Sequence, residues 1–312
     1  MSAPAPEGVL VVDKPAGMTS HDVVDRIRRV AGTRRVGHTG TLDPAATGVL
    51  VVCLGRATRL VTALQAGTKT YAAVVRLGTT TASDDLDGEV LTTVDTSHLD
   101  EAAVCAALSG FRGTFEQVPP MVSAVRVDGE RLHARARRGE VVDRPARRVT
   151  VESILLDRFS PGPAAEVAFL VSCSAGTYVR SLARDLGAAL EVGGTLASLR
   201  RVSNGPFVVD DAVTLDELEA DPQLLTARLL TPVAALRRAV TVHEVTDPAT
   251  ARALVTGTRP ERLGLGSPSD RTTALVHGPL LLAVVGPGPD GPQHLVWSQP
   301  ADLDALRQAD AG

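Results

Sequence analysis

The chain contains few aromatic residues and few cysteines. Aromatic residues occupy 3% of its 312 positions, so Val, Leu and Ala must fill most of the core, and each of the two tyrosines is informative. Cys53, Cys105 and Cys173 are scattered along the chain and form no C-x-x-C pair. This spacing predicts neither a zinc site nor a disulfide framework. Cys53 and Cys173 lie in apolar runs, which favours small buried core residues.

The sequence also lacks long apolar runs, an excess of positive charge and nucleotide-binding fingerprints. No segment approaches the ~20 apolar residues of a membrane span, and residues 1–8 do not have the basic-then-apolar order of a secretory leader. We therefore expect a cytoplasmic protein without a membrane partner, and disorder over residues 1–8. The net charge of −4 argues against a nonspecific nucleic-acid coat but is compatible with a local basic face. Without a P-loop, a dinucleotide motif or a His/Cys cluster, we expect no small-molecule cofactor and no metal.

The most unusual stretch is residues 37–48, with the sequence GHTGTLDPAATG. Its glycines, threonines and proline exclude a regular helix or a central strand. Pro44 restricts the backbone of Asp43 to extended conformations, and the apolar run at residues 49–54 predicts a buried strand. A rigid loop therefore presents the Asp43 carboxylate at the edge of a sheet, where catalytic groups are often held. An Asp-Pro pair alone is more typical of a simple turn.

The longer string GHTGTLDPAATGVLVVCLGRATRL, at residues 37–60, resembles the catalytic motif of the TruB-type tRNA pseudouridine synthases. Four further matches follow the order of the family: DKPAGMTSHDVV, KTY, FRGTFEQVPPMVSA and CSAGTYVRSLARDLG. The family modifies uridine-55 in the T loop of tRNA, so the resemblance implies the T arm of tRNA as partner. We expect a monomer.

The resemblance also implies an architecture. It predicts an α+β pseudouridine synthase fold, in which a mixed, mostly antiparallel sheet is flanked by helices. The sequence pattern changes near residues 236–243, where short apolar runs, Gly and Pro become frequent. We place a catalytic domain at residues 1–238 and a small PUA-like β domain at residues 239–312.

Three residues match the family's chemical centre. Asp43 matches the catalytic aspartate. Arg180 matches the arginine that pairs with it, and an opposite charge at close range keeps a carboxyl ionised by lowering its pKa. Tyr71 matches the tyrosine that stacks on the flipped uracil, and such stacking contributes about 1–3 kcal/mol per base.

Other matches surround this centre. His38 matches a histidine that helps to displace the target uridine from its loop. Tyr178 would pack beside the uracil, and Leu199 would form part of the apolar pocket wall. Lys14 is grouped with the substrate site as a support beneath the catalytic loop. Asp85 is a candidate to orient a basic group nearby.

The most basic part of the chain spans residues 126–148. We predict a helix from Glu130 to Arg138, which would place Arg131, Arg135 and Arg138 on one face. Arginine forks match phosphate oxygens, so this stripe is a candidate contact with the RNA backbone. A second candidate is the cluster before the catalytic loop: Arg28, Arg29, Arg34 and Arg35.

Two other functions are compatible with parts of the pattern. A glycoside or nucleoside hydrolase would pair Asp43 with a second carboxylate, but no second acid stands out near the motifs. A noncatalytic RNA-binding or tRNA-folding protein could use the same groove. The residues also leave open whether Asp43 is a covalent nucleophile or a base and electrostatic stabiliser. Tyr71 and water are both candidates to take the C5 proton.

Overall fold

The computed structural model describes residues 5–121, 126–127, 130–131, 144–265, 271–287 and 293–296. The expected disorder of residues 1–8 is wrong for the part that is described. Gly8 is buried as the first residue of strand β1 (Gly8–Lys14). The carboxylate of Glu7 lies 2.6 Å from Arg56 Nε.

A ten-stranded sheet dominates the fold, and its long path runs β14-β1-β3-β12-β4-β11-β10-β7. Strand β13 pairs with β12, and β2 pairs with β3. Two pairings, β1 with β14 and β12 with β3, are parallel, and the others are antiparallel. This confirms the mixed, mostly antiparallel sheet. Besides β1, its strands are β2 (Val36–His38), β3 (Thr47–Leu54), β4 (Lys69–Leu77), β7 (Gly113–Gln117), β10 (Arg147–Ser160), β11 (Glu166–Cys173), β12 (Gly194–Asn204), β13 (Phe207–Val208) and β14 (Val213–Thr214).

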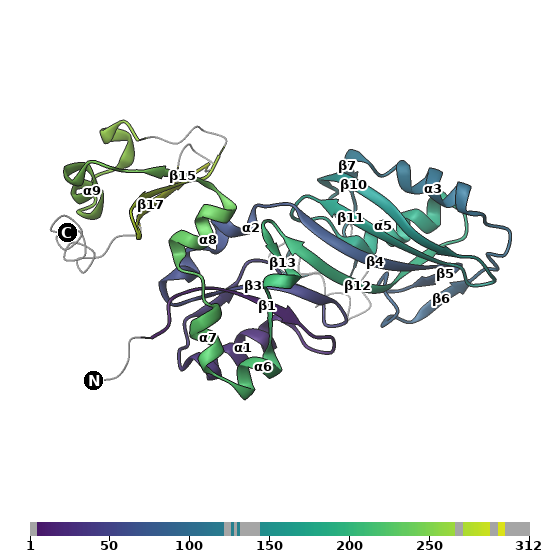
Figure 1. Ribbon diagram of the computed structural model, residues 1–312. Helices are drawn as coiled ribbons and strands as arrows, with labels where there is room; N and C mark the ends of the chain where they lie inside the picture. The colour runs from purple at the N-terminus through teal and green to yellow at the C-terminus, as the bar shows by residue number, and fades with distance from the viewer. Residues whose placement is uncertain are drawn as a thin grey trace.

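Helices and short hairpins surround this sheet (Figure 1). The α-helices are α1 (Ser20–Ala31), α2 (Val61–Gln65), α3 (Glu101–Ser109), α5 (Val179–Ala189), α6 (Leu215–Ala220), α7 (Gln223–Arg228), α8 (Pro232–Ala239) and α9 (Pro248–Val255). The 3₁₀ turns are η1 (Gly55–Leu60), η2 (Val209–Asp211) and η3 (Pro260–Leu263). The hairpins are β5 (Thr79–Thr81) with β6 (Val90–Thr93), and β8 (Arg126–Val127) with β9 (Glu130–Arg131). No helix within these described residues is both long and apolar enough to span a bilayer.

The alternation of β4 decides which of its side chains enter the core. Every second residue from Lys69 to Leu77 is buried, and the residues between them are half-buried. Since side chains alternate across a strand, Tyr71, Ala73 and Val75 share the face that packs against α5. Helix α5 contributes Leu182 and Leu186 to the same cluster. Tyr71 is therefore held on the core-facing side of β4.

A second sheet lies at the other end of the molecule and follows helix α8 (Figure 1). Its order is β15-β16-β17-β18, with β15 (Thr241–Glu244), β16 (Thr273–His277), β17 (Leu280–Gly286) and β18 (Gln293–Val296). Leu236 of α8 belongs to one apolar cluster with Val9 of β1 and Val276 of β16. Helix α8 therefore packs against both sheets. The expected domain boundary at residue 238 falls in its last turn and stays a prediction.

The predicted helix from Glu130 to Arg138 is wrong at its start. Glu130 and Arg131 form strand β9, which pairs with β8 through Arg126↔Arg131 and Val127↔Glu130. Arg135 and Arg138 lie outside the described residues. Arg131 therefore lies in a strand and not on a helical face with the two later arginines. At this position the pairing of two strands takes precedence over the helical spacing of the charges.

Candidate active site

The loop between β2 and β3 carries Asp43 and is held by Lys14. The Lys14 side chain is fully buried. Its Nζ donates hydrogen bonds to the backbone oxygens of Ala46 at 2.7 Å, Pro15 at 2.8 Å and Pro44 at 3.2 Å. An ammonium has three N–H donors, so all of them are used on the chain itself. Lys14 thus supports the loop and has no exposed surface with which to contact a substrate.

The start of helix α1 fixes the residues on both sides of Asp43. Ser20 Oγ accepts a hydrogen bond from Leu42 N at 2.8 Å and donates one to Leu42 O at 3.1 Å. Gly17 N donates to Pro44 O at 2.9 Å. The helix begins at Ser20 because Thr19 forms a capping box with Asp22. Two sequence motifs more than twenty residues apart therefore form one rigid unit.

Gly48 allows strand β12 to approach the other end of the loop. A Cβ atom at Gly48 would lie 2.2 Å from Arg201 O, and the φ of Gly48 is +100°. Only glycine fits such a close approach at this backbone angle. The Arg201 side chain then donates from Nε to Val49 O at 2.7 Å and from Nη2 to Gly40 O at 3.1 Å.

Arg180 joins the loop to a second acidic turn. It is the second residue of α5 and is 5% exposed. Its Nη2 lies 3.0 Å from Asp43 Oδ2, and its Nη1 lies 3.4 Å from Asp85 Oδ2. Nη1 also donates to Ser83 O at 3.1 Å. Asp85 therefore contacts a basic group of the site, as we expected, and our expectation that no second acid lies near the motifs is wrong.

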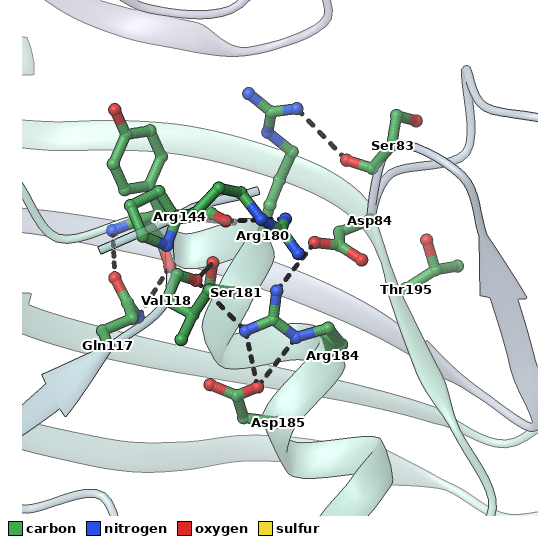
Figure 2. Close-up of polar contacts among 12 residues, drawn as sticks. Ser83, Asp84, Gln117, Val118, Arg144, Arg180, Ser181, Arg184, Asp185 and Thr195 are labelled. Carbon is green, nitrogen blue, oxygen red and sulfur yellow. Dashed lines mark hydrogen bonds and ion pairs between the residues drawn. The ribbon is translucent and has the colours of Figure 1, made fainter. Parts of the chain in front are cut away.

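Arg184, one helical turn after Arg180, holds the same acidic turn. Figure 2 shows its guanidinium between Asp84 and Asp185. Nη1 donates to Asp84 Oδ2 at 3.2 Å, Nε donates to Asp185 Oδ1 at 2.9 Å, and Nη2 donates to Val118 O at 3.2 Å. The φ of Asp84 is +62°, an uncommon value for a residue other than glycine. Arg184 therefore helps to fix the turn that contacts Arg180.

A pocket of about 250 Å³ opens beside Asp43. Its walls bring together side chains that are far apart in the sequence, including Tyr71 of β4, Tyr178, Arg180 and Leu199 of β12. Gln117 positions Tyr178 by donating from Nε2 to Tyr178 O at 3.1 Å, while its Oε1 accepts from Tyr178 N at 2.8 Å. The pocket therefore combines an ionic pair with two aromatic rings and an apolar wall.

Comparison with known families agrees with this arrangement. The family model described as the N-terminal domain of TruB family pseudouridylate synthases matches residues 28–179. The model described as the tRNA pseudouridylate synthase B C-terminal domain matches residues 180–240.

The chain belongs to the TruB family of pseudouridylate synthases.

Relatives of the TruB family match most of the chain. It is 55% identical over 220 residues to tRNA pseudouridine synthase B of Thermobifida fusca (strain YX), which covers 69% of this chain and 75% of the relative. The protein of the same name from Corynebacterium efficiens is 48% identical over 276 residues, which cover 86% of this chain and 91% of the relative. Among solved structures, the crystal structure of a Cbf5-Nop10-Gar1 complex superposes with a TM-score of 0.69 at 27% identity, covering 89% of this chain and 77% of that chain. The chain is thus a pseudouridine synthase with the fold that the sequence predicts.

The acid of this TruB-family site has a raised pKa. Burial is the largest cause, because a charged carboxylate loses solvation in the narrow pocket, although 43% of the Asp43 side chain remains accessible. The guanidinium of Arg180 acts in the opposite direction, and the charge of Asp85 adds to the rise. Arg180 lowers the pKa of Asp43, as we expected, but desolvation outweighs this attraction and the net shift is upward.

His38 lies next to the pocket and is not one of the side chains that line it. Its Nδ1 accepts a hydrogen bond from Gly40 N at 3.2 Å. Burial and the nearby Arg201 charge lower the pKa of His38, so its imidazole is neutral at pH 7. The ring is consequently tied to the loop that carries Asp43.

The predicted phosphate contacts are only partly described. Arg28, Arg29 and Arg34 line a surface hollow of about 630 Å³ at the end of α1. Arg28 is already engaged there, because its Nη1 lies 2.8 Å from Asp25 Oδ1 and its Nε donates to Arg34 O. This hollow is lined by none of the residues that surround Asp43. The side chain of Arg131 is outside the described part of the chain, as are Arg135 and Arg138.

Sequence reasoning missed three charged residues of the site: Lys69, Arg184 and Arg201. A polar residue at the start of a strand is typical of a solvated turn, so the sequence did not predict that Lys69 is buried. Within the described residues, no group of three or more His, Cys, Asp or Glu side chains is placed to hold a metal ion.

Proposed function

We propose that this chain converts uridine to pseudouridine at position 55 in the T loop of tRNA. The observation that carries the proposal is the ion pair between Asp43 and Arg180, which opens into a pocket walled by two tyrosines and a leucine. The relatives named tRNA pseudouridine synthase B support tRNA as the substrate. The two family models together match residues 28–240, which include every residue that lines the pocket.

The target base has to leave its stack before the chemistry begins, because an enzyme cannot reach the glycosidic bond inside folded RNA. Tyr71 stacks on the uracil, with Tyr178 beside it and Leu199 as the apolar wall. His38 assists the displacement of the uridine from the T loop. Its neutral imidazole suits this role, since a neutral ring can fill the gap left by a base without burying a charge.

Asp43 performs the bond rearrangement in its ionised form. The N1–C1′ bond breaks, the uracil turns, and C5 joins C1′. Asp43 acts either as a nucleophile at the sugar carbon or as a base and electrostatic stabiliser. Arg180 aims the carboxylate and opposes its protonation, and Asp85 orients Arg180. The last proton leaves C5 to Tyr71 or to water.

The reaction is an isomerisation, so it consumes no redox equivalent and transfers no group to an acceptor. We therefore propose that the chain uses no cofactor, and that it acts as a monomer on the T arm. Arg131, Arg135 and Arg138 contribute phosphate contacts. Residues 1–238 form the catalytic domain and residues 239–312 a small PUA-like domain, a division that the separate β15–β18 sheet supports.

The test is tritium release from uridine labelled at C5 in a tRNA transcript. Wild-type protein should release the label from position 55, and a transcript with cytidine at that position should retain it. Release from the cytidine transcript would mean that another uridine is the target. Free uracil in the mixture would instead indicate hydrolysis, the outcome expected if Asp43 and Asp85 worked as a hydrolytic pair.

A further inference from the structure

Two buried cations line the same pocket as Asp43. Lys69 is 6% exposed, and Arg201 is 1% exposed. Lys69 lies two residues before Tyr71 on the buried face of β4. Arg201 is the direct partner of Tyr71 across the pairing of β12 with β4. Both positive groups therefore flank the tyrosine that would stack on the base.

Neither cation has a carboxylate partner within the described residues. Lys69 Nζ donates to Gln65 O at 2.8 Å and to Gly67 O at 2.9 Å. Arg201 donates to the backbone oxygens of Val49 and Gly40, and its guanidinium also contacts the side chain of Tyr71. Since an ammonium has three donors, one N–H of Lys69 is not engaged by these bonds. Arg180, in contrast, has two carboxylates in contact.

Burying positive charge without an opposite charge is costly. The pKa of Lys69 is lowered to about 8, first by burial and then by the charge of Arg201. The ammonium form still predominates at neutral pH. A site that keeps two such cations in its wall is suited to an anion that enters or forms there.

The proposed reaction generates an anion at this place. When the N1–C1′ bond breaks, its electron pair stays on N1, and the uracil becomes a monoanion with charge on N1, O2 and O4. This holds whether Asp43 attacks C1′ or removes a sugar proton. The anion then uses C5 to form the new bond to C1′, and the C5 proton is lost.

We propose that Lys69 and Arg201 form a cationic subsite that stabilises the detached uracil anion between bond cleavage and bond formation. The inference rests on the proposed function. It assigns the free donor of Lys69 to a uracil oxygen while the base is stacked on Tyr71. Preorganised donors aimed at developing charge are among the strongest contributions to catalysis.

The experiment compares Lys69→Met with Lys69→Arg in the full chain under single-turnover conditions. The substrate is a tRNA transcript carrying either uridine or 5-fluorouridine at position 55, and the readout is loss of that nucleoside. Fluorine stabilises the uracil anion, so a better leaving group should depend less on Lys69. Arg76→Met is the matched control, because Arg76 is a cation of the same strand on the opposite face, paired with Glu166.

For Lys69→Met we expect a loss of about 100-fold with uridine. The loss with 5-fluorouridine should be at least about fivefold smaller, and Lys69→Arg should recover most of the rate. Affinity for tRNA should stay within about twofold of wild type. Arg76→Met should behave as wild type. Because the two nucleosides are compared within one variant, a lower fraction of folded enzyme cancels from the ratio.

Equal losses with both nucleosides would overturn the proposal, since a purely structural role does not respond to the leaving group. A weaker tRNA affinity at an unchanged single-turnover rate would also overturn it and would assign Lys69 to a backbone phosphate. Failure of the proposed function itself is distinguishable, because wild-type protein would then convert neither nucleoside.

Discussion

At the scale of single residues, Arg180 connects segments that are far apart in the sequence. It contacts Asp43 in the loop before β3 and Asp85 in the turn before β6. Its planar fork can serve two carboxylates at once, and a lysine ammonium cannot reproduce that geometry. Arg180 therefore fixes the direction of Asp43 as well as its charge.

The variant Arg180→Lys separates orientation from charge. We expect the single-turnover rate to fall by about 100-fold or more, because a point charge no longer aims the carboxylate. Affinity for tRNA should change little. The control is Arg76→Lys. Arg76 lies on the face of β4 opposite to Tyr71, and its guanidinium pairs with Glu166. A rate close to wild type in Arg180→Lys would mean that Arg180 only packs.

The raised pKa of Asp43 predicts a pH dependence with a definite sign. In the proposed mechanism the reaction needs the carboxylate of Asp43, so the rate should fall as the pH falls through the pKa of Asp43. Since burial raises that pKa above 3.8, the midpoint should lie above this ordinary value. Single-turnover rates from roughly pH 4.5 to pH 8 would locate it. In Arg180→Lys the midpoint should not move down; a downward shift would contradict the assigned role.

At the scale of elements, local patterns predicted the structure where one pattern had no competitor. The apolar run at residues 49–54 predicted a buried strand, and every residue of β3 in that run is buried. Residues 130–131 failed, because charge spacing suggested a helix and the chain pairs them with β8 instead. Such a hairpin depends on two-residue strands whose signal is too short to read.

The basic stretch at residues 126–148 has a measurable consequence. Replacing Arg131, Arg135 and Arg138 with Gln should reduce the slope of log affinity for tRNA against log salt by about 3. The reason is that a variant with fewer phosphate contacts releases fewer counterions from the RNA when it binds. A control triple at the exposed Arg112, Arg158 and Arg228 keeps the same charge change. A slope unchanged from wild type would exclude phosphate binding by this stretch.

At the scale of the whole molecule, the position of β12 could not be predicted from the sequence. This strand lies between β3 and β4, parallel to the first and antiparallel to the second. The insertion brings Leu199 and Arg201 to the pocket that Asp43 and Tyr71 share. Periodicity gives the buried face of a strand but not its neighbours, so the family resemblance supplied the topology and the location of Asp43, Arg180 and Tyr71.

The same limit explains the charges that were missed. Lys69 and Arg201 read as polar residues, and only the long-range pairing of β4 with β12 buries them together. The place of Asp85 depends likewise on a distant contact, since Leu86 N donates to Leu196 O at 3.1 Å. These contacts join segments more than 100 residues apart, beyond the reach of local patterns.

The proposed division into two domains predicts that the larger part folds alone. A chain ending at residue 240 keeps α8 and its contacts with β1. It should unfold in one cooperative thermal transition, at a lower temperature than the full chain because Leu236 loses its packing against Val276. Circular dichroism and calorimetry would measure this. A broad, non-cooperative transition would mean that the proposed domain boundary at residue 238 is in the wrong place.

The central claim is that Asp43 drives uridine isomerisation in tRNA. The most direct measurement is tritium release from C5-labelled tRNA by wild type and by Asp43→Asn, with binding of the same tRNA measured in parallel. Asparagine keeps the size of the side chain and removes the charge. The account predicts release by wild type, none above background by Asp43→Asn, and similar tRNA affinity for both. Equal release by the two proteins would contradict it.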